Sequence, residues 1–283
     1  MFPKAVDQHK PNKPLIPNGL GVVYVLISVV YLFLLYYFDY SAALPLAGCI
    51  LFGGFMGLLD DWIDLRWRYK AFLPLFASLP LAVQRGEALG PEATKIATYF
   101  FGKIDFGIYF YIIVIPLIVT VTTNAINQLG GLNGLETICP SVVALGLMAT
   151  STEKSIFLLG PLLVYLILAF FNFRGKIFVG NTGSFAIGIT LASYAVTTNN
   201  EQTLLIAILP YIFNSCLILA NALLLGKAAR LILEGRHLRS ENRRSLLTII
   251  ACFRPFTERQ LVVFVSVIVA FSTSIAVLVW LLV

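Results

Sequence analysis

Apolar runs of about twenty residues recur along the chain, separated by short segments that hold charged residues, Gly or Pro. An α-helix of about 20 apolar residues is long enough to cross a hydrocarbon core of about 30 Å. The pattern therefore predicts nine membrane-spanning helices. They are expected near 19–38, 42–58, 71–84, 106–123, 138–151, 155–172, 182–198, 203–225 and 261–283.

The composition agrees with this pattern, since 59% of the residues are hydrophobic and only 12% are charged. Such values exclude an ordinary soluble domain. The predicted fold class is an all-α polytopic transmembrane helical bundle that forms a single domain over residues 1–283. The spans 71–84 and 138–151 are short for a bilayer, so we expect these helices to be tilted against neighbours or partly buried in the bundle.

The basic residues orient the bundle. If the nine helices alternate, 16 of the 20 Lys and Arg residues fall on one side of the membrane, which should then be the cytoplasmic side. The net charge of +6 comes from short loops at the membrane surface, without the pattern of a nucleic-acid-binding fold. We therefore expect anionic lipid, phosphate or nucleotide as partner, and no nucleic acid.

The end of the second apolar run carries a dense cluster of charges. Its members are Asp60, Asp61, Asp64, Arg66, Arg68 and Lys70. If the helix continues past the interface, Asp60 and Asp64 share one face, and like charges so close require a nearby cation or a proton. Lys70 and the two arginines are in range to supply the cation. This segment alone fits a headgroup anchor and an active site equally well.

A second polar segment spans 124–136 and is rich in Asn and Gly. Asn124 and Asn127 are one helical turn apart, and the glycines that follow let the backbone approach a ligand closely. Carboxamide oxygens can coordinate Mg²⁺, and the amides of a glycine-rich turn can bind a nucleotide. A helix cap followed by a turn explains fewer of these groups, so a functional interpretation is favoured.

Two further segments suit anions. Asn181 is a good N-cap for the span 182–198, where backbone amides would face an anion, although capping alone also explains it. The long basic loop 226–260 contains Arg236 and His237, which are suited to phosphate oxygens.

Under the alternating topology, all four polar segments reach the same face, together with the segment 10–13. Carboxylates, carboxamides, glycine turns and arginines at one interface are what phosphoryl transfer needs: groups to hold a metal, cations to hold charge, and a group to activate the acceptor.

At these residues the chain resembles the polyprenyl-phosphate N-acetylhexosamine-1-phosphate transferases. It is most similar to the UDP-GlcNAc:dolichyl-phosphate GlcNAc-phosphotransferase branch of eukaryotes and archaea. The aspartates of 60–64 resemble the family's aspartate-rich motif, and 65–70 its eukaryotic-type continuation. The stretch 124–136 resembles the Asn-rich signature of that branch, because bacterial members usually carry aspartates at the positions of Gly130 and Asn133.

The resemblance implies transfer of GlcNAc-1-phosphate from UDP-GlcNAc to a polyprenyl (dolichyl) phosphate, giving GlcNAc-diphospho-polyprenol and UMP. This is the first step of lipid-linked oligosaccharide synthesis for protein N-glycosylation. The implied cofactor is Mg²⁺, for which Mn²⁺ is a compatible substitute. The active site would face the cytoplasm in an archaeal plasma membrane or an ER membrane. A homodimer in the lipid bilayer is compatible with the sequence.

The resemblance also assigns residues. Catalytic positions fall on Asp60, Asp61 and Lys70, and metal positions on Asn127 and Asn181. Substrate-binding positions fall on Lys13, Trp67, Asn124, Gly131, Leu132, Asn133, Arg236, His237 and Arg239. In this family pattern Asn133 contacts uracil. The lipid phosphate would be the nucleophile with help from Asp60, and a covalent route through an aspartate stays open.

Three departures keep alternatives open. Asn181 stands where the family usually has a metal-binding aspartate, so Mg²⁺ should bind more weakly. The family's ten-helix fold would lack its first helix, and its Arg-His-Arg run is interrupted by Leu238. The alternatives are another UDP-N-acetylhexosamine donor or a catalytically impaired relative. A transporter is disfavoured, because its polar groups would lie near the bilayer midplane rather than at span ends.

Overall fold

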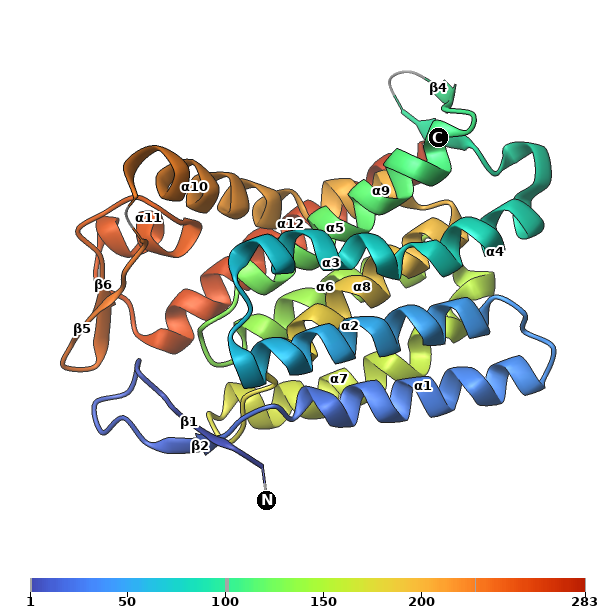
Figure 1. The fold of residues 1–283 in the computed structure, drawn as a ribbon. Helices are drawn as coiled ribbons and strands as arrows, with labels where there is room; N and C mark the ends of the chain where they lie inside the picture. Colours follow the sequence, from blue (N-terminus) through green and yellow to red (C-terminus); the bar gives the residue numbers. More distant parts are fainter. Residues whose placement is uncertain (1, 100–101, 227, 283) are drawn as a thin grey trace.

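The computed structural model describes residues 2–99, 102–226 and 228–282, and its helices run side by side along one long axis (Figure 1). The α-helices are α1 (Gly21–Tyr37), α2 (Ala43–Ile63), α3 (Trp67–Ala77), α4 (Leu79–Leu89), α5 (Ile115–Gln128), α6 (Leu135–Ala149), α7 (Ile156–Phe173), α8 (Gly180–Thr198), α9 (Glu201–Ala207), α10 (Leu209–Leu225), α11 (Leu246–Phe253) and α12 (Glu258–Leu281). Shorter helical segments are η1 (Gly90–Glu92), η2 (Phe110–Val114) and η3 (Thr152–Lys154).

Three antiparallel two-stranded hairpins lie outside the bundle. They are β1 (Lys4–Val6) with β2 (Leu15–Pro17), β3 (Lys95–Thr98) with β4 (Gly102–Asp105), and β5 (Ile232–Glu234) with β6 (His237–Arg239). The first and third lie at the end of the bundle where α2 finishes, and the second lies at the opposite end near the C-terminus (Figure 1). We call these the double-hairpin end and the single-hairpin end. The all-α class is thus confirmed for the bundle, with strands added in polar connections.

Each predicted apolar span overlaps one helix or two consecutive helices. The span 71–84 falls on α3 and α4, and the span 203–225 on α9 and α10, which meet at an angle of 62°. Pro80 and Pro210 lie in the first turn of the second helix of each pair. Both breaks follow from proline, which lacks the N–H that would continue the hydrogen-bond ladder.

By length and apolar composition, four of the described helices can cross a bilayer: α2, the continuous segment Phe110–Gln128, α7 and α12. The bent pair of α9 and α10 makes a fifth. Helices α1 and α6 are apolar but shorter, with 17 and 15 residues. The protein is therefore a multi-pass membrane protein, as predicted, while the count of nine spans stays a prediction.

Several helix ends differ from the prediction by a few residues, and the differences near the polar segments matter most. Helix α2 continues to Ile63 instead of ending near 58, and α6 begins at Leu135 instead of 138. The segment 226–260, predicted as a loop, contains the β5–β6 hairpin and α11. The polar residues at the end of α2 and at the start of α6 therefore lie within helical turns, and the helix backbone fixes the directions of their side chains.

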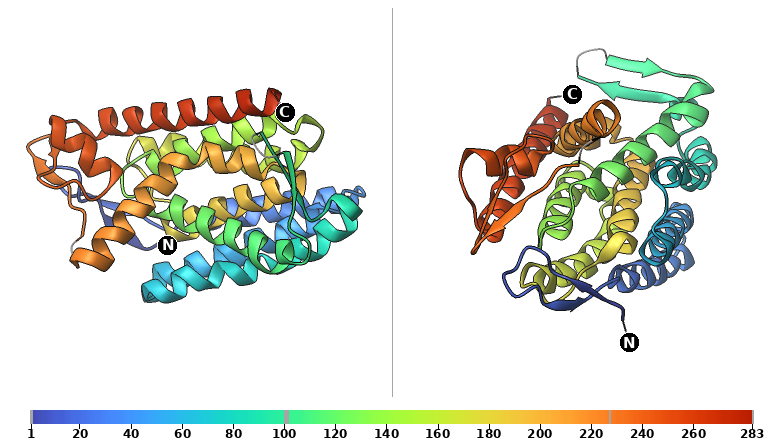
Figure 2. Two further views of the ribbon diagram at one scale, coloured as in Figure 1. Left: turned by 90° about the horizontal axis from the view of Figure 1, so that it is seen from above. Right: turned by 60° about the vertical axis from the view of Figure 1, so that its left-hand side comes forward.

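Helix α8 forms the centre of the bundle and is surrounded by the other long helices (Figure 2). Every residue from Thr182 to Thr197 is buried. Glycines bring its first turn against two neighbours, because a Cβ on Gly21 would lie 2.1 Å from the Gly183 nitrogen and one on Gly57 would lie 2.3 Å from the Asn181 oxygen. The end of α2 therefore lies directly beside the start of α8.

Candidate active site

Asp60 lies in the last turn of α2 and is 3% exposed. Its Oδ1 atom pairs with Lys70 Nζ at 2.8 Å and accepts a hydrogen bond from the Leu65 N–H at 2.9 Å. Its Oδ2 atom is buried without a hydrogen-bond partner in the described part of the chain. A buried carboxylate oxygen without a donor is costly, so a ligand, proton or cation is expected to complete it.

Lys70 holds this carboxylate from the first turn of α3. Its ammonium also lies 3.4 Å from Asp64 Oδ1. Burial lowers the pKa of Lys70, but the hydrogen bonds and charges of Asp60 and Asp64 more than offset this, and the pKa lies above its usual value. Lys70 is therefore a cation at neutral pH, suited to hold negative charge and not to act as a base.

The expectation that Asp60 and Asp64 share one helical face is wrong. Helix α2 ends at Ile63, and Asp64 takes a left-handed conformation with φ of 45° as its C-cap. The backbone turns there, and the Asp64 side chain is 97% exposed. Trp67 follows and is 63% exposed, with the Arg68 guanidinium 5.8 Å from its ring centre.

Asp61 faces α8 instead of Lys70. Its Oδ1 accepts from the Asn181 N–H at 2.9 Å, and its Oδ2 accepts from the Thr182 N–H at 2.9 Å and from the Thr182 hydroxyl at 2.7 Å. A carboxylate is favourable there because the helix N-terminus is positive. The prediction that Asn181 is the N-cap is wrong, because the cap position is Val179 and Asp61 of α2 bonds the free amides.

The predicted metal residues are linked through one hydroxyl. Ser184 donates to Asn127 Oδ1 at 2.6 Å and lies 3.3 Å from the Asn181 carbonyl oxygen. Asn124 is directed differently, since its Nδ2 donates to the Thr120 carbonyl of its own helix at 2.9 Å. The structure thus brings Asn127 and Asn181 together and turns Asn124 back onto α5.

The glycine-rich turn is fixed by a carboxylate that the sequence did not single out. The Gly131 N–H donates to Glu136 Oε1 at 2.8 Å, and Gly131 itself has a φ of +100°. Glu136 is the last residue of the polar segment 124–136 but was given no role there, and its position in the first turn of α6 follows from the earlier start of that helix.

Asn133 is used as a structural cross-link. Its Nδ2 donates to Asp7 Oδ2 and to Glu258 Oε1, both at 2.8 Å, and its backbone N–H donates to Glu258 Oε1 at 2.9 Å. Asp7 also pairs with Lys10 at 2.9 Å. These bonds join the N-terminal hairpin, the glycine turn and α12, and a uracil contact by Asn133 stays a prediction.

Two adjoining cavities open beside these groups. One of about 290 Å³ is lined by residues that include Asp61, Gly131, Leu132, Glu136 and Asn181. A second of about 230 Å³ shares Gly131 and Leu132 and extends toward α10 and α11. Asp61, Asn181 and the glycine turn therefore share one space, and Asp60, Lys70 and Asn127 are not among the residues that line it.

Five predicted substrate residues stay on the surface of the double-hairpin end. Arg236, His237 and Arg239 are exposed on the β5–β6 hairpin, Lys13 on the turn after β1, and Trp67 at the start of α3. None of them lines the cavities found among the described residues. Their expected contacts with substrate stay predictions.

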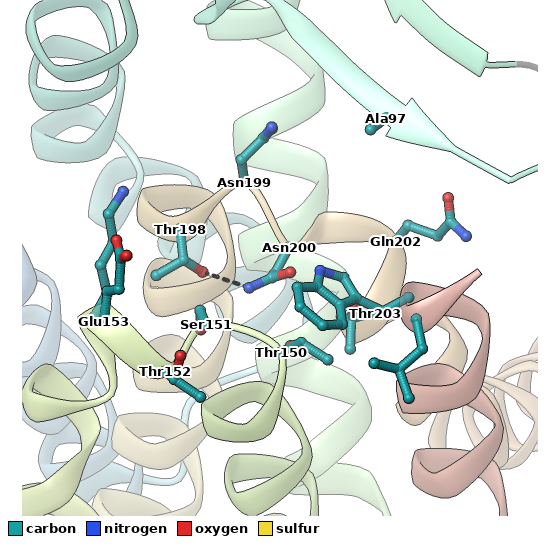
Figure 3. Close-up of a pocket in the computed structure, with 13 residues that line it drawn as sticks. Ala97, Thr150, Ser151, Thr152, Glu153, Thr198, Asn199, Asn200, Gln202 and Thr203 are labelled. Carbon is teal, nitrogen blue, oxygen red and sulfur yellow. Dashed lines mark hydrogen bonds between the residues drawn. The ribbon is translucent and has the colours of Figure 1, made fainter. Parts of the chain in front are cut away.

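The largest cavity, about 690 Å³, lies at the single-hairpin end between the ends of α6, α8 and α12. Threonines and carboxamides such as Thr150, Thr203 and Asn200 surround it (Figure 3). It is lined by one carboxylate, Glu153, and by Lys154, and none of the predicted site residues reaches it. It lacks the paired charges that phosphate chemistry needs, so the double-hairpin end is the candidate site.

The apolar helices and the polar side chains that line the cavities of the double-hairpin end are typical of a multi-pass membrane enzyme. Comparison with known families makes this specific. The model of glycosyl transferase family 4 matches residues 43–199, and the chain belongs to this family.

Similar proteins extend along most of the chain. A protein of Saccharolobus solfataricus is 32% identical over 285 residues, covering 96% of this chain and 86% of the relative. One of Sulfolobus acidocaldarius is 34% identical over 73% of this chain and 66% of the relative. Both are provisionally named UDP-N-acetylglucosamine–dolichyl-phosphate N-acetylglucosaminephosphotransferase.

A Dictyostelium discoideum protein bears the same name without that qualification. It is 30% identical over 70% of this chain and 59% of the relative. The resemblance to the archaeal and eukaryotic branch is thereby confirmed.

Proposed function

We propose that this protein transfers GlcNAc-1-phosphate from UDP-GlcNAc to a polyprenyl (dolichyl) phosphate and releases UMP, as the first step of lipid-linked oligosaccharide synthesis for N-glycosylation. The observation that carries the proposal is the buried Asp60 carboxylate, paired with Lys70 and left with one unpartnered oxygen at the end of a membrane helix. The names of the similar archaeal and eukaryotic proteins support the choice of donor and acceptor.

In the proposed reaction an oxygen of the lipid phosphate bonds to the phosphorus that carries GlcNAc. The bond from that phosphorus to the bridging oxygen breaks, and UMP leaves with that oxygen. Asp60 would orient the acceptor phosphate and take its proton if one is present, and Lys70 would hold Asp60 and balance the incoming charge. A covalent aspartyl route stays open as an alternative. Asp60 suits it better than Asp61, since both Asp61 oxygens already accept hydrogen bonds from the first turn of α8.

Mg²⁺ is proposed as cofactor on the chemistry of the donor set. Across the residues that the structure describes, Asp60 Oδ2 is a buried hard oxygen without a partner. The side chain of Asn127 and the backbone of Asn181 offer further oxygens, both in contact with the Ser184 hydroxyl. Among the described residues no group of three or more His, Cys, Asp or Glu side chains could hold a metal ion, so substrate phosphates would complete the coordination. When bound, the ion would neutralise charge on the diphosphate.

The site is proposed to face the cytoplasm, because the double-hairpin end contains the segments that hold most of the basic residues. A different UDP-N-acetylhexosamine is the second candidate donor. It is favoured by the surface position of Arg236 and His237, since the resemblance assigns both to substrate binding and a changed position would suit a different sugar.

The test is a direct assay of the full chain in lipid nanodiscs. Radiolabelled UDP-GlcNAc, dolichyl phosphate and Mg²⁺ should yield UMP and GlcNAc-diphospho-dolichol in equal amounts, and chelation of the metal should stop both. A panel of UDP-N-acetylhexosamines separates the two donors. Folded protein that releases UMP from none of them would refute the proposed activity.

A further inference from the structure

The two cavities at the double-hairpin end meet at the N-terminal hairpin. His9, between β1 and β2, lines both of them together with Gly131 and Leu132. The hairpin and the glycine turn therefore border the same space, and His9 lies where the two cavities adjoin. Nothing in the sequence pattern marks this histidine, which sits in a short polar segment before the first helix.

The cavity walls are acidic, and this makes His9 the lining residue best suited to contact an anionic ligand. The walls carry three carboxylates, Asp7, Asp61 and Glu136, and among their described residues no Lys or Arg. His9 is the one lining side chain there that can carry positive charge. A nucleoside diphosphate placed among carboxylates needs cationic donors, and the arginines expected for this role lie on the surface.

The local structure holds His9 in place and leaves its ring available. The His9 backbone N–H donates to Asp7 Oδ1 at 3.3 Å, and Asp7 is 2% exposed and fixed by Lys10 and Asn133. The imidazole is half-buried, and no hydrogen bond from it to another described residue is present. Its nitrogens can therefore donate to a ligand without breaking an existing contact.

We propose that His9 binds the diphosphate of the sugar nucleotide by donating a hydrogen bond from its imidazole to a phosphate oxygen. The inference rests on the proposed function for its ligand class, a nucleoside diphosphate. In this arrangement the N-terminal hairpin supplies a ring N–H donor to a cavity whose other ionisable lining residues are carboxylates. His9 is a substrate-binding residue and takes no part in bond making.

The test separates phosphate from nucleoside contacts by measuring the affinities of UDP and uridine for the full chain in nanodiscs with Mg²⁺. Loss of a hydrogen bond to a charged group predicts that His9→Ala weakens UDP binding about tenfold and changes uridine binding less than about twofold. His9→Gln keeps an uncharged donor and should fall between wild type and His9→Ala. Lys4→Gln removes a cation from β1, outside the cavities, and should change neither affinity.

Activity gives a second measurement, in which His9→Ala should raise KM for UDP-GlcNAc more than it lowers kcat. Unchanged UDP affinity in His9→Ala would overturn the proposal, as would equal losses for UDP and uridine. Melting temperatures equal to wild type show that the variants fold. If wild type binds UDP through His9 but turns over no UDP-N-acetylhexosamine, the proposed function fails while this inference stands.

Discussion

The two ends of the bundle each hold a buried ion pair, and the pairs are built for different tasks. At the double-hairpin end, Lys70 pairs with Asp60, and its side chain is 25% exposed. At the single-hairpin end, Arg85 pairs with Glu201, and the Arg85 side chain is fully buried. Within the described ranges each acid keeps one oxygen without a hydrogen-bond partner, Asp60 Oδ2 and Glu201 Oε2. The two ion pairs therefore differ mainly in their cation, which is Lys70 in one and Arg85 in the other.

The donors of Arg85 are all engaged. Its Nε donates to the Ala93 carbonyl at 2.7 Å and its Nη2 to Asn199 Oδ1 at 2.8 Å and to the Lys95 carbonyl at 3.2 Å. Its Nη1 donates to the Val196 carbonyl and to Glu201. A planar guanidinium with fixed donors suits a structural clamp, whereas the compact ammonium of Lys70 can shift toward a ligand. We therefore infer that the buried ion pair of Arg85 stabilises the fold, whereas that of Lys70 is the one proposed to serve the reaction.

The largest expected effect is on stability, from Arg85→Met. Glu201 would then be buried without its cation, and breaking a buried pair in this way costs about 3–5 kcal/mol. Thermal unfolding in nanodiscs should show a strongly lowered Tm or no folded protein. The double variant Arg85→Met with Glu201→Leu removes both charges and should recover part of the loss. A Tm equal to wild type in Arg85→Met would break the comparison.

Asp60→Asn should act on activity instead. Asn keeps the size of the side chain but cannot take a proton or offer a charged oxygen, so turnover should fall about 100-fold to 1000-fold. The matched control is Asp64→Asn, which removes the same charge from an exposed side chain beside Lys70 and should change turnover less than about threefold. Equal effects of the two substitutions on UMP release would remove Asp60 from the mechanism.

Gly57→Ala tests whether the site depends on close helix packing. A Cβ at this position would lie 2.3 Å from the Asn181 oxygen and 2.5 Å from the Thr182 Cα, both of them backbone atoms. The contact of α2 with α8 must widen, at a cost of about 1–3 kcal/mol, and the Asp61 cap should loosen with it. Gly48→Ala in the same helix has nothing within 4 Å of its new Cβ and should not lower Tm. Matching Tm values for the two variants would contradict the packing argument.

The smallest expected effect is that of Asn181→Asp. An added carboxylate beside Asp61 should raise the affinity for Mg²⁺ about threefold to tenfold, because affinity for a hard cation rises with the charge of its ligands. The measurement is UMP release as a function of Mg²⁺ concentration. Asn221→Asp, whose carboxamide bonds its own helix in α10, should leave that dependence unchanged. Unchanged or weaker Mg²⁺ dependence in Asn181→Asp would show that this position does not ligate the metal.

The positions of the helices could be predicted well because crossing a bilayer demands long apolar runs, and each predicted span overlaps helical structure. The breaks before α4 and α10 were missed because apolar residues continue through Pro80 and Pro210. The hairpins were missed for another reason, since strands of three or four residues leave no readable alternation.

The site could be predicted only in part. Asp60 and Asp61 are adjacent in sequence, but successive residues of a helix point about 100° apart, so one meets Lys70 and the other caps α8. The cap was assigned to Asn181 because capping rules consider local sequence, whereas the carboxylate that performs it comes from another helix. Glu136 lay inside a recognised segment without an assigned role and His9 lay outside every motif, so their place in the cavity wall emerged only from the three-dimensional arrangement.

The capping of α8 by Asp61 joins the cavity wall to the most buried helix of the protein. A ligand that drew this carboxylate toward itself would free two backbone amides at the head of that helix, whereas one that left it in place would shield them. The rate of amide hydrogen exchange at Asn181 and Thr182 would therefore report whether a ligand fills the cavity. Ligand binding at this end of the bundle would in this way change the rigidity of its central helix.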